Sequence, residues 1–257
     1  MSEHILTQQD NGVLRIQMAR ADKKNALTIA MYEAMTAALA AAEADPAVRV
    51  VIFEGSPTSF TAGNDLGDFL NHPPTGEDSP VFRFLKALIA AEKPLLAAVH
   101  GVAVGIGTTM LLHCDLVYAG PSARFQLPFV NLGLTPEAAS SLILPQLMGH
   151  RRAAELLLLG EMIDADTAFA LGLINRVHAD DDLDAFVLGK AQQLAAKAPT
   201  AVRLSKQLMK RWPAAAVQQA MSAEGEVFIQ RLHSPEAREA MTAFFERRPP
   251  DFTRSIG

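Results

Sequence analysis

The sequence predicts an α/β protein whose chain ends in a run of helices. Short apolar runs rich in β-branched residues alternate with helical segments up to about residue 135. Such alternation is typical of strands joined by right-handed crossovers into one sheet. Beyond that point most segments have helical spacing. The 257 residues, 49% hydrophobic and 20% charged, supply enough apolar material for a packed core.

The first half of the chain contains most of the predicted strands. An Asp10-Asn11-Gly12 turn between two alternating segments indicates a hairpin. The run VRVVIF is typical of a strand buried on both faces. We expect strands at 5–9, 13–18, 48–53, 95–100 and 115–119, and helices at 28–43, 80–91 and 105–112. The segment 54–65 is expected to be a loop, and a second glycine-bearing loop, 100–107, is expected to open the helix at 105–112.

The second half is predicted to be mainly helical. Helices are expected at 136–148, 151–159, 165–170, 183–194, 199–211, 214–231 and 235–246, with one strand at 173–177. We therefore divide the chain into an α/β core, residues 1–197, and a C-terminal helical region, residues 198–257. Apolar residues of the last three helices, including Met221, Phe228, Met241 and Phe244, are interpreted as packing residues.

Charge and composition exclude several classes of protein. The net charge of −5 argues against nucleic acid as a partner. The single cysteine, Cys114, cannot form an internal disulfide framework, and the start of the chain lacks the pattern of a leader peptide, so the cytoplasm is the expected compartment. The stretch 94–112 is apolar, but Pro94 and its glycines favour a buried strand, turn and helix, and no membrane association is expected.

Several common catalytic and ligand-binding motifs are absent. The chain has no G-x-S-x-G elbow, no H-E-x-x-H zinc motif and no phosphate-binding P-loop. His113, Cys114 and Asp115 are neighbours, but adjacent side chains at a helix-to-strand junction point in different directions, so no metal site is expected. The glycine spacing after residue 100 does not fit a dinucleotide fingerprint.

Two glycine-bearing loops are the candidate site. The segments 60–66 and 100–107 each follow a predicted parallel strand, where ligands collect in open α/β sheets. Glycines there leave backbone N–H groups free to face a ligand, and two such donors would form an oxyanion hole. From spacing alone, ordinary tight turns remain the alternative interpretation.

The same loops carry a resemblance to the crotonase (enoyl-CoA hydratase/isomerase) superfamily. It covers nearly the whole chain through segments in the family's order: RADKKNAL (20–27), FTAGNDL (60–66), AVHGVAVG (98–105), CDLVYA (114–119), AFALGLIN (168–175), EGEVF (224–228) and RRPPDF (247–252). The resemblance implies the crotonase (ClpP/crotonase-like) spiral of ββα units with a C-terminal helical region. It also implies an acyl-CoA thioester substrate and no cofactor, since coenzyme A is part of the substrate.

The resemblance assigns roles to individual residues. The backbone N–H groups of Asn64 and Ile106 would be the oxyanion donors. The coenzyme A and substrate contacts would come from Lys24, Ala26, Ala62, Gly63, Asp65, Leu66, Gly105, Thr109 and Phe129. From the residues alone, Asp65 is equally well a loop-capping side chain, and Lys23 and Lys24 are equally well a solvated pair.

The departures from the family pattern favour an isomerase. Thr109 and Phe129 occupy the positions of the two hydratase glutamates, and neither side chain is a general base. The segment NLGLTPEAASS (131–141) is similar to that of the Δ3,Δ2-enoyl-CoA isomerases, in which Glu137 matches the catalytic glutamate. One such base would move a C3–C4 double bond to C2–C3. The T-P-E sequence alone also fits the first turn of a helix, which would lower the pKa of Glu137, whereas an apolar channel would raise it.

The resemblance also leaves three alternatives to the isomerase activity and implies an oligomeric state. The rival activities are hydration of an enoyl-CoA, another acyl-CoA lyase or hydrolase reaction, or binding of acyl-CoA without catalysis. The family's assembly implies a homotrimer or a dimer of trimers. Apolar positions at Val202, Leu204, Leu208 and Val217 of the helical region are compatible with such interfaces, although the region would equally fold back on its own core.

Overall fold

Two β-sheets form the centre of the protein in the computed structural model, which describes residues 2–76 and 78–254. The larger sheet has the order β1-β2-β3-β5-β7-β10, and only β1 is antiparallel to its neighbour. Its strands are β1 (Ile5–Asp10), β2 (Val13–Met18), β3 (Val50–Glu54), β5 (Leu95–Val99), β7 (Leu116–Ala119) and β10 (Arg176–Val177). The smaller sheet consists of β4 (Ser59–Thr61), β6 (Val102–Val104), β8 (Arg124–Gln126) and β9 (Ile163–Asp164).

The chain alternates between the two sheets as it advances. Strands β3, β5 and β7 of the larger sheet are each followed by β4, β6 or β8 of the smaller one. Helices follow the first two of these pairs, which produces the predicted spiral of ββα units. The α/β class and the crotonase-like fold are therefore confirmed. The three-residue strands of the smaller sheet were missed because so short a segment shows no periodicity.

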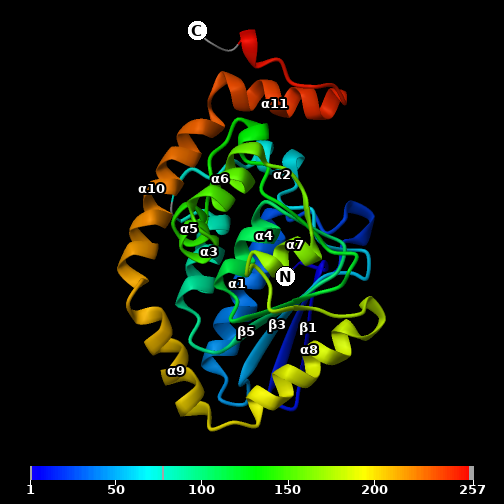
Figure 1. Ribbon diagram of the computed structural model, residues 1–257, viewed down its shortest axis with the longest axis vertical. Coiled ribbons are helices and arrows are strands. Elements are labelled where there is room, and N and C mark those ends of the chain that lie inside the picture. Colours follow the sequence, from blue (N-terminus) through cyan, green and yellow to red (C-terminus); the bar gives the residue numbers. More distant parts are fainter. Residues whose placement is uncertain (1, 77, 255–257) are drawn as a thin grey trace.

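The helices complete the fold (Figure 1). They are α1 (Ile29–Ala44), α2 (Leu66–Asn71), α3 (Pro80–Ala90), α4 (Ile106–Thr109), α5 (Ser140–Met148), α6 (His150–Leu159), α7 (Ala165–Ala170), α8 (Asp180–Ala195), α9 (Pro199–Arg211), α10 (Ala214–Leu232) and α11 (Pro235–Glu246). Short 3-10 turns lie at Ala21–Lys23, Met110–His113, Val130–Leu132 and Phe252–Arg254. Most predicted helices are present within a few residues of their expected bounds.

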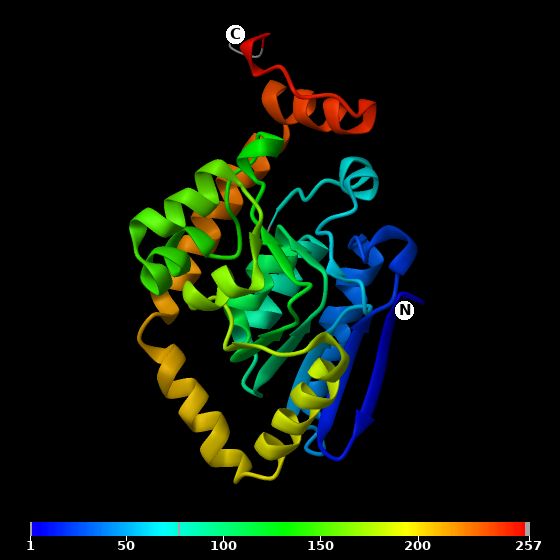
Figure 2. The ribbon, with the colours of Figure 1, turned by 45° about the vertical axis from the view of Figure 1, so that its right-hand side comes forward.

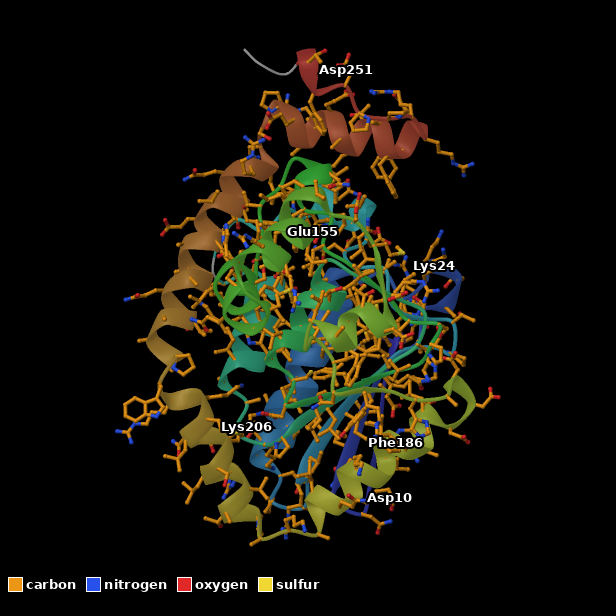
Figure 3. All side chains as sticks on the ribbon, in the orientation of Figure 1. Asp10, Lys24, Glu155, Phe186, Lys206 and Asp251 are labelled. Carbon is orange, nitrogen blue, oxygen red and sulfur yellow. The ribbon has the colours of Figure 1, made fainter. Side chains whose placement is uncertain are left out.

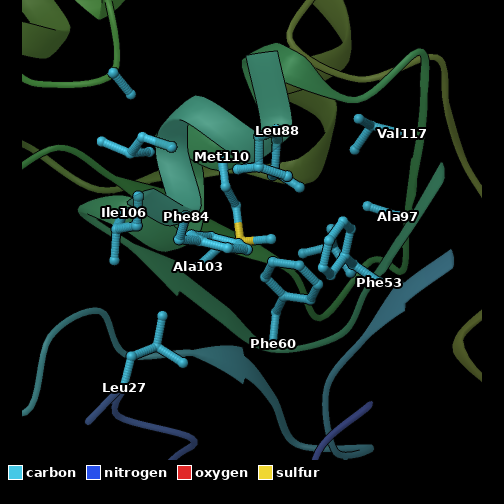
Figure 4. Close-up of a cluster of buried hydrophobic side chains, with 14 of the residues drawn as sticks. Leu27, Phe53, Phe60, Phe84, Leu88, Ala97, Ala103, Ile106, Met110 and Val117 are labelled. Carbon is cyan, nitrogen blue, oxygen red and sulfur yellow. The ribbon is translucent and has the colours of Figure 1, made fainter. Parts of the chain in front are cut away.

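Alternate side chains of the central strands enter two separate cores. Val51 and Phe53 of β3 pack in the large cluster that includes residues of α1 and α3, whereas Val50 and Ile52 pack against α8. Successive side chains of a strand point to opposite faces, so helices must cover both sides of this sheet. Figure 4 shows that Phe60 and Ile106, one from each glycine loop, lie in the large cluster beside Phe84. The loops of the candidate site are thus anchored in the main core.

The C-terminal helices wrap around one side and one end of the molecule (Figure 2). Helix α10 contacts α5, and α11 contacts the turn at Val130–Leu132. Met221, Phe228 and Met241 are buried in the main core. Helix α9 is attached differently, because its buried Lys206 donates to Asp115 at 2.7 Å while the outer side chains are exposed (Figure 3). Exposed apolar residues of this helix are Leu204, Leu208 and Met209, and Trp212, the residue that follows it, is exposed as well.

Two of the predicted elements needed correction. The helix expected from residue 136 begins only at Ser140, because Ala138 and Ala139 have left-handed φ angles of 60° and 58° that an α-helix cannot include. The strand expected at 173–177 is reduced to Arg176–Val177. The apolar stretch 94–112 is divided among β5, β6, α4 and a 3-10 turn, and no described helix is long and apolar enough to cross a membrane.

Candidate active site

A cavity of about 720 Å³ lies where the two glycine loops face α3 and the C-terminal helices. Both loops contribute to its wall, as do the segment that precedes α5 and residues of α10 and α11. Every site residue predicted from the sequence lines this cavity except Lys24 and Thr109; those that line it are Ala26, Ala62, Gly63, Asn64, Asp65, Leu66, Gly105, Ile106, Phe129 and Glu137. The structure therefore brings the two loops and Glu137 together.

Glycines allow the two loops to approach each other closely. Gly63 has a φ angle of 88°, and a Cβ atom there would lie 2.8 Å from the carbonyl oxygen of Val104. In the opposite direction, a Cβ atom on Gly107 would lie 2.6 Å from the side chain of Thr61. A side chain at either position would push the loops apart. The absence of a side chain at these two glycines therefore permits the close approach of the loops.

The backbone around Asn64 leaves its N–H group without a partner among the described residues. Leu27 N–H donates to the Gly63 carbonyl at 2.8 Å, and Asp65 N–H donates to the Leu27 carbonyl at 2.9 Å. In extended chain, successive N–H groups point in opposite directions, so the Asn64 N–H faces away from this pairing. The side chain of Asn64 is held separately, because the Tyr32 hydroxyl donates to its Oδ1 at 2.5 Å.

The second loop presents an N–H group at the start of α4. Gly105 precedes this helix with φ 56° and ψ −119°, and Ile106 is its first residue. The N–H of a first helical residue has no acceptor within its own helix. Ile106 keeps helical geometry with its side chain buried, so the isoleucine leaves the main-chain donor intact. Two backbone donors from separate loops thus border one cavity, as an oxyanion hole requires.

Glu137 is a buried carboxylate at this cavity and has no cationic partner in the described structure. The Thr109 hydroxyl donates to its Oε1, and its Oε2 accepts no hydrogen bond from a described residue. Burial raises the pKa of Glu137 to about 8, while the Thr109 hydrogen bond lowers it and the charge of Glu224 raises it further. Because Glu137 precedes α5 and lies outside its first turn, the capping interpretation of the T-P-E sequence is wrong. Burial, and not the helix dipole, dominates.

The residues at the two hydratase positions have different surroundings. Thr109 is fully buried in α4, and its hydroxyl is engaged with Glu137 instead of lining the cavity. Phe129 lines the cavity with an apolar ring. In the described chain, Asp65 and Glu137 are the only carboxylates of the cavity wall, and Asp65 is paired with Arg20 at 2.7 Å. A second free carboxylate for holding water is therefore missing from this wall.

Asp65 and Lys24 have mainly structural contacts, whereas Lys23 borders the cavity. Asp65 caps α2 by accepting from the Asp68 N–H at 3.1 Å, although it also borders the cavity. Lys23 lines the cavity and Lys24 does not. The backbone of Lys24 is left-handed, with φ 50°, and its carbonyl accepts from Ala62 N–H at 2.9 Å, which joins this segment to the first loop. Figure 3 shows Lys24 at the outer surface.

Sequence reasoning missed the contribution of the C-terminal helices to the cavity. Phe228 and Phe244, interpreted above as packing residues, line it together with Phe82 and Phe245. Phe228 also packs edge-on against Phe69 of α2. Nothing in the local sequence separates these aromatic residues from ordinary core residues such as Met221, because their place depends on how α10 folds back.

The His113-Cys114-Asp115 neighbours have separate partners. The His113 Nε2 lies 2.8 Å from the Ala138 carbonyl, and burial lowers the pKa of His113 to about 4, so the ring is neutral and donates from Nε2. Asp115 accepts from Leu95 N–H at 2.8 Å, while burial raises the pKa of the Cys114 thiol to about 12. No set of three metal-ligating side chains gathers anywhere in the described part of the chain.

Comparison with known proteins agrees with this architecture. The sequence model of the enoyl-CoA hydratase/isomerase family matches residues 8–255. The crystal structure of an enoyl-CoA hydratase/isomerase from Pseudoalteromonas atlantica superimposes with a TM-score of 0.93 at 44% identity, covering 97% of this chain and all of that chain.

Two curated relatives have different activities. Enoyl-CoA delta isomerase 2 of Rattus norvegicus is 34% identical over 96% of this chain, which spans only 65% of the length of that protein. The 2,3-dehydroadipyl-CoA hydratase of Escherichia coli is 32% identical over 98% of this chain and 99% of the bacterial enzyme. Sequence identity of this size does not separate the two reactions.

Proposed function

The chain belongs to the crotonase superfamily, as a member of the enoyl-CoA hydratase/isomerase family, and from that premise we propose that it is an enoyl-CoA isomerase that shifts a C3–C4 double bond to C2–C3. The observation that carries the proposal is the single unpaired carboxylate of the cavity wall. Glu137 is buried beside both glycine loops and has no cationic partner in the described structure. Isomerisation needs one such base, whereas hydration needs a second group that positions water.

The proposed reaction removes one proton from C2 of the acyl chain and adds one proton at C4. The Glu137 carboxylate takes a proton from C2, and the electron pair passes to the thioester oxygen, which becomes enolate-like. The N–H groups of Asn64 and Ile106 stabilise that oxygen. The Glu137 carboxylic acid then returns a proton to C4, and the double bond forms between C2 and C3. An acid whose pKa is about 8 is well suited to both steps near neutral pH.

The cavity wall is consistent with an acyl-CoA thioester as substrate. Aromatic and aliphatic side chains from α3, α10 and α11 supply an apolar surface for an acyl chain; they include Phe82, Leu85, Phe228 and Phe244. Lys23 is a cation on the same wall and forms no ion pair with a described residue, which suits it to a phosphate of coenzyme A. The chemistry proposed here uses only these side chains and backbone groups.

Hydration is the rival reaction because the family and its curated relatives include both activities. The surroundings of Glu137 argue against it. The Thr109 hydroxyl already donates to Glu137, and Phe129 offers no polar atom, so the two positions that hold water in a hydratase are unavailable for that purpose.

One spectroscopic assay distinguishes the reactions. With a 3-enoyl-CoA, an isomerase produces the absorbance of a conjugated 2-enoyl-CoA; with a 2-enoyl-CoA, a hydratase removes it. We expect the first signal to dominate and to fall by at least about a hundredfold in Glu137→Gln, as loss of a general base implies. Glu226→Gln, which alters an exposed residue of α10, is the matched control. Faster hydration than isomerisation, or full isomerase activity in Glu137→Gln, would refute the proposal.

A further inference from the structure

The turn that carries Glu137 has a backbone conformation that needs external support. Ala138 and Ala139 are consecutive and both left-handed, with φ angles of 60° and 58°. Residues with a Cβ atom adopt this conformation at an energetic cost, and it persists only where the surroundings hold it. The local hydrogen bonds are that of the Ser140 N–H to the Glu137 carbonyl at 3.1 Å and those of the Leu142 and Ile143 N–H groups to the Ala139 carbonyl at 3.1 and 2.9 Å. None of them holds Ala138, so contacts from elsewhere in the chain help to fix the turn.

Two side chains from distant segments hold this turn, one at its first left-handed residue and one beyond its second. His113 Nε2 donates to the Ala138 carbonyl at 2.8 Å. From α10, the Glu224 carboxylate accepts from the Ser141 N–H at 2.8 Å and also from the Ser141 hydroxyl. The same carboxylate faces the backbone N–H groups of Ala139 and Ser140. Glu224 thus gathers the N–H groups at the start of α5, which have no acceptor within the helix.

Burying the Glu224 carboxylate at this position costs folding free energy, which indicates that the residue has a function here. It is 8% exposed, its second oxygen Oε2 accepts no hydrogen bond from a described residue, and none of its described partners is a cation. A helix start can be capped by a small neutral side chain on the preceding residue. A carboxylate reaching in from a helix 83 positions along the chain brings a negative charge as well as an acceptor.

We infer that Glu224 is a positioning residue for Glu137: its carboxylate fixes the left-handed turn at Ala138 and Ala139 and thereby aims Glu137 into the cavity beside both glycine loops. The inference deepens the proposed isomerase function and rests on it for the role of Glu137. It assigns Glu224 no contact with the substrate, because Glu224 does not line the cavity. Helix α10 consequently contributes twice, with Phe228 in the cavity wall and Glu224 behind it.

The charge of Glu224 also acts on Glu137. It raises the pKa of Glu137, in addition to the larger effect of burial. The other ionisable groups facing this region are Tyr32 from α1, whose pKa is raised by burial and by Glu137, the neutral His113, and Lys206 and Lys210 of α9, whose charges act on His113. Neither lysine shifts the pKa of Glu137, and neither forms an ion pair with Glu224 in the described structure. A neutral replacement at this position should therefore make Glu137 easier to ionise.

Three variants separate positioning from simple structural support. Glu224→Gln keeps the shape and one acceptor oxygen but removes the charge. Glu224→Ala removes both, and Ser141→Ala removes only the hydroxyl contact and is the mildest change. We expect Glu224→Ala to lower kcat roughly 10- to 100-fold with little change in KM, since a misplaced catalytic group costs that much. We expect Glu224→Gln to retain much of kcat and to shift its pH dependence to lower pH.

The decisive measurement does not depend on turnover. Carboxyl carbons labelled with ¹³C are titrated by NMR in the full-length protein, and the Glu137 signal is assigned by its loss in Glu137→Gln. We expect the Glu137 midpoint to move downward in Glu224→Gln and to stay at the wild-type value in Glu226→Gln. If the Glu137 midpoint is the same in Glu224→Gln as in wild type, and kcat is unchanged in Glu224→Ala, Glu224 is merely structural and the inference is overturned.

The two proposals fail in different experiments. If wild-type protein lacks isomerase activity, or Glu137→Gln retains it, the proposed function is wrong, whereas the NMR titration still reports whether Glu224 acts on Glu137. If Glu137→Gln is inactive, the titration shows no shift and Glu224→Ala keeps the wild-type kcat, only the role of Glu224 is wrong. Should Glu224→Ala fail to fold, the near-isosteric Glu224→Gln and the mild Ser141→Ala variant provide the same comparison.

Discussion

Replacing Glu137 with glutamine should stabilise the folded protein at alkaline pH and have little effect at acidic pH. Burial raises the pKa of this carboxyl to about 8, against 4.5 for an ordinary glutamate. Above pH 8 the native protein therefore holds a buried charge without a cationic partner among the described residues. Glutamine has nearly the same shape and no charge, and its side-chain oxygen can still accept from the Thr109 hydroxyl.

The sign and size follow from proton linkage. A group whose pKa is raised in the folded state stabilises the protein fully below its unfolded pKa, and this stabilisation is lost as the pH rises to the folded pKa. The loss therefore falls between pH 4.5 and about 8. At about 1.4 kcal/mol per pH unit, this interval corresponds to a loss of unfolding free energy on the order of 5 kcal/mol. For a chain of this length that is roughly 10 °C in Tm.

The assay is unfolding by heat or urea, followed by circular dichroism at pH 5, 7 and 9. The Tm of Glu137→Gln minus that of wild type should grow steadily with pH and be largest at pH 9. Glu226→Gln removes an exposed carboxylate from α10 and serves as the control. A difference that stays constant with pH, or that shrinks toward pH 9, would show that Glu137 is not a buried, unpaired acid.

Three further predictions concern the pH dependence of the rate, the backbone donor at Asn64 and the oligomeric state. For isomerase activity, kcat/KM should rise with pH and reach half its maximum near pH 8, because Glu137 must be ionised to act as a base; initial rates between pH 6 and 9.5 test this, and a midpoint below pH 6 contradicts it. Asn64→Ala should keep most activity because the N–H remains, whereas Asn64→Pro removes the donor and should lower kcat at least about a hundredfold; equal losses would implicate the side chain held by Tyr32. We propose a trimer or dimer of trimers that covers the exposed apolar face of α9 and the adjoining Trp212, which is 83% exposed; light scattering should give three or six times the mass of the chain, and a monomer would refute it.

Elements with strong local patterns were predictable from the amino-acid sequence. The hairpin around Asp10-Asn11-Gly12, the buried strands β3 and β5, and the long helices have a period or a turn sequence that neighbouring residues alone create. The two glycine loops were also identified, since a glycine at a strand end signals a close backbone approach. The family motifs added Glu137 and the oxyanion donors, which spacing alone left undecided.

Properties that depend on residues distant in sequence could be determined only from the folded structure. The T-P-E segment is locally a good helix start, yet tertiary contacts from His113 and Glu224 accompany a left-handed turn at Ala138 and Ala139 instead. The direction of the pKa change of Glu137 likewise followed from burial, which is produced by the whole surrounding core. Phe228 entered the cavity wall because α10 folds back over it. Local patterns act between neighbours along the chain, whereas burial, register and cavity shape arise only when segments separated by tens of residues pack together.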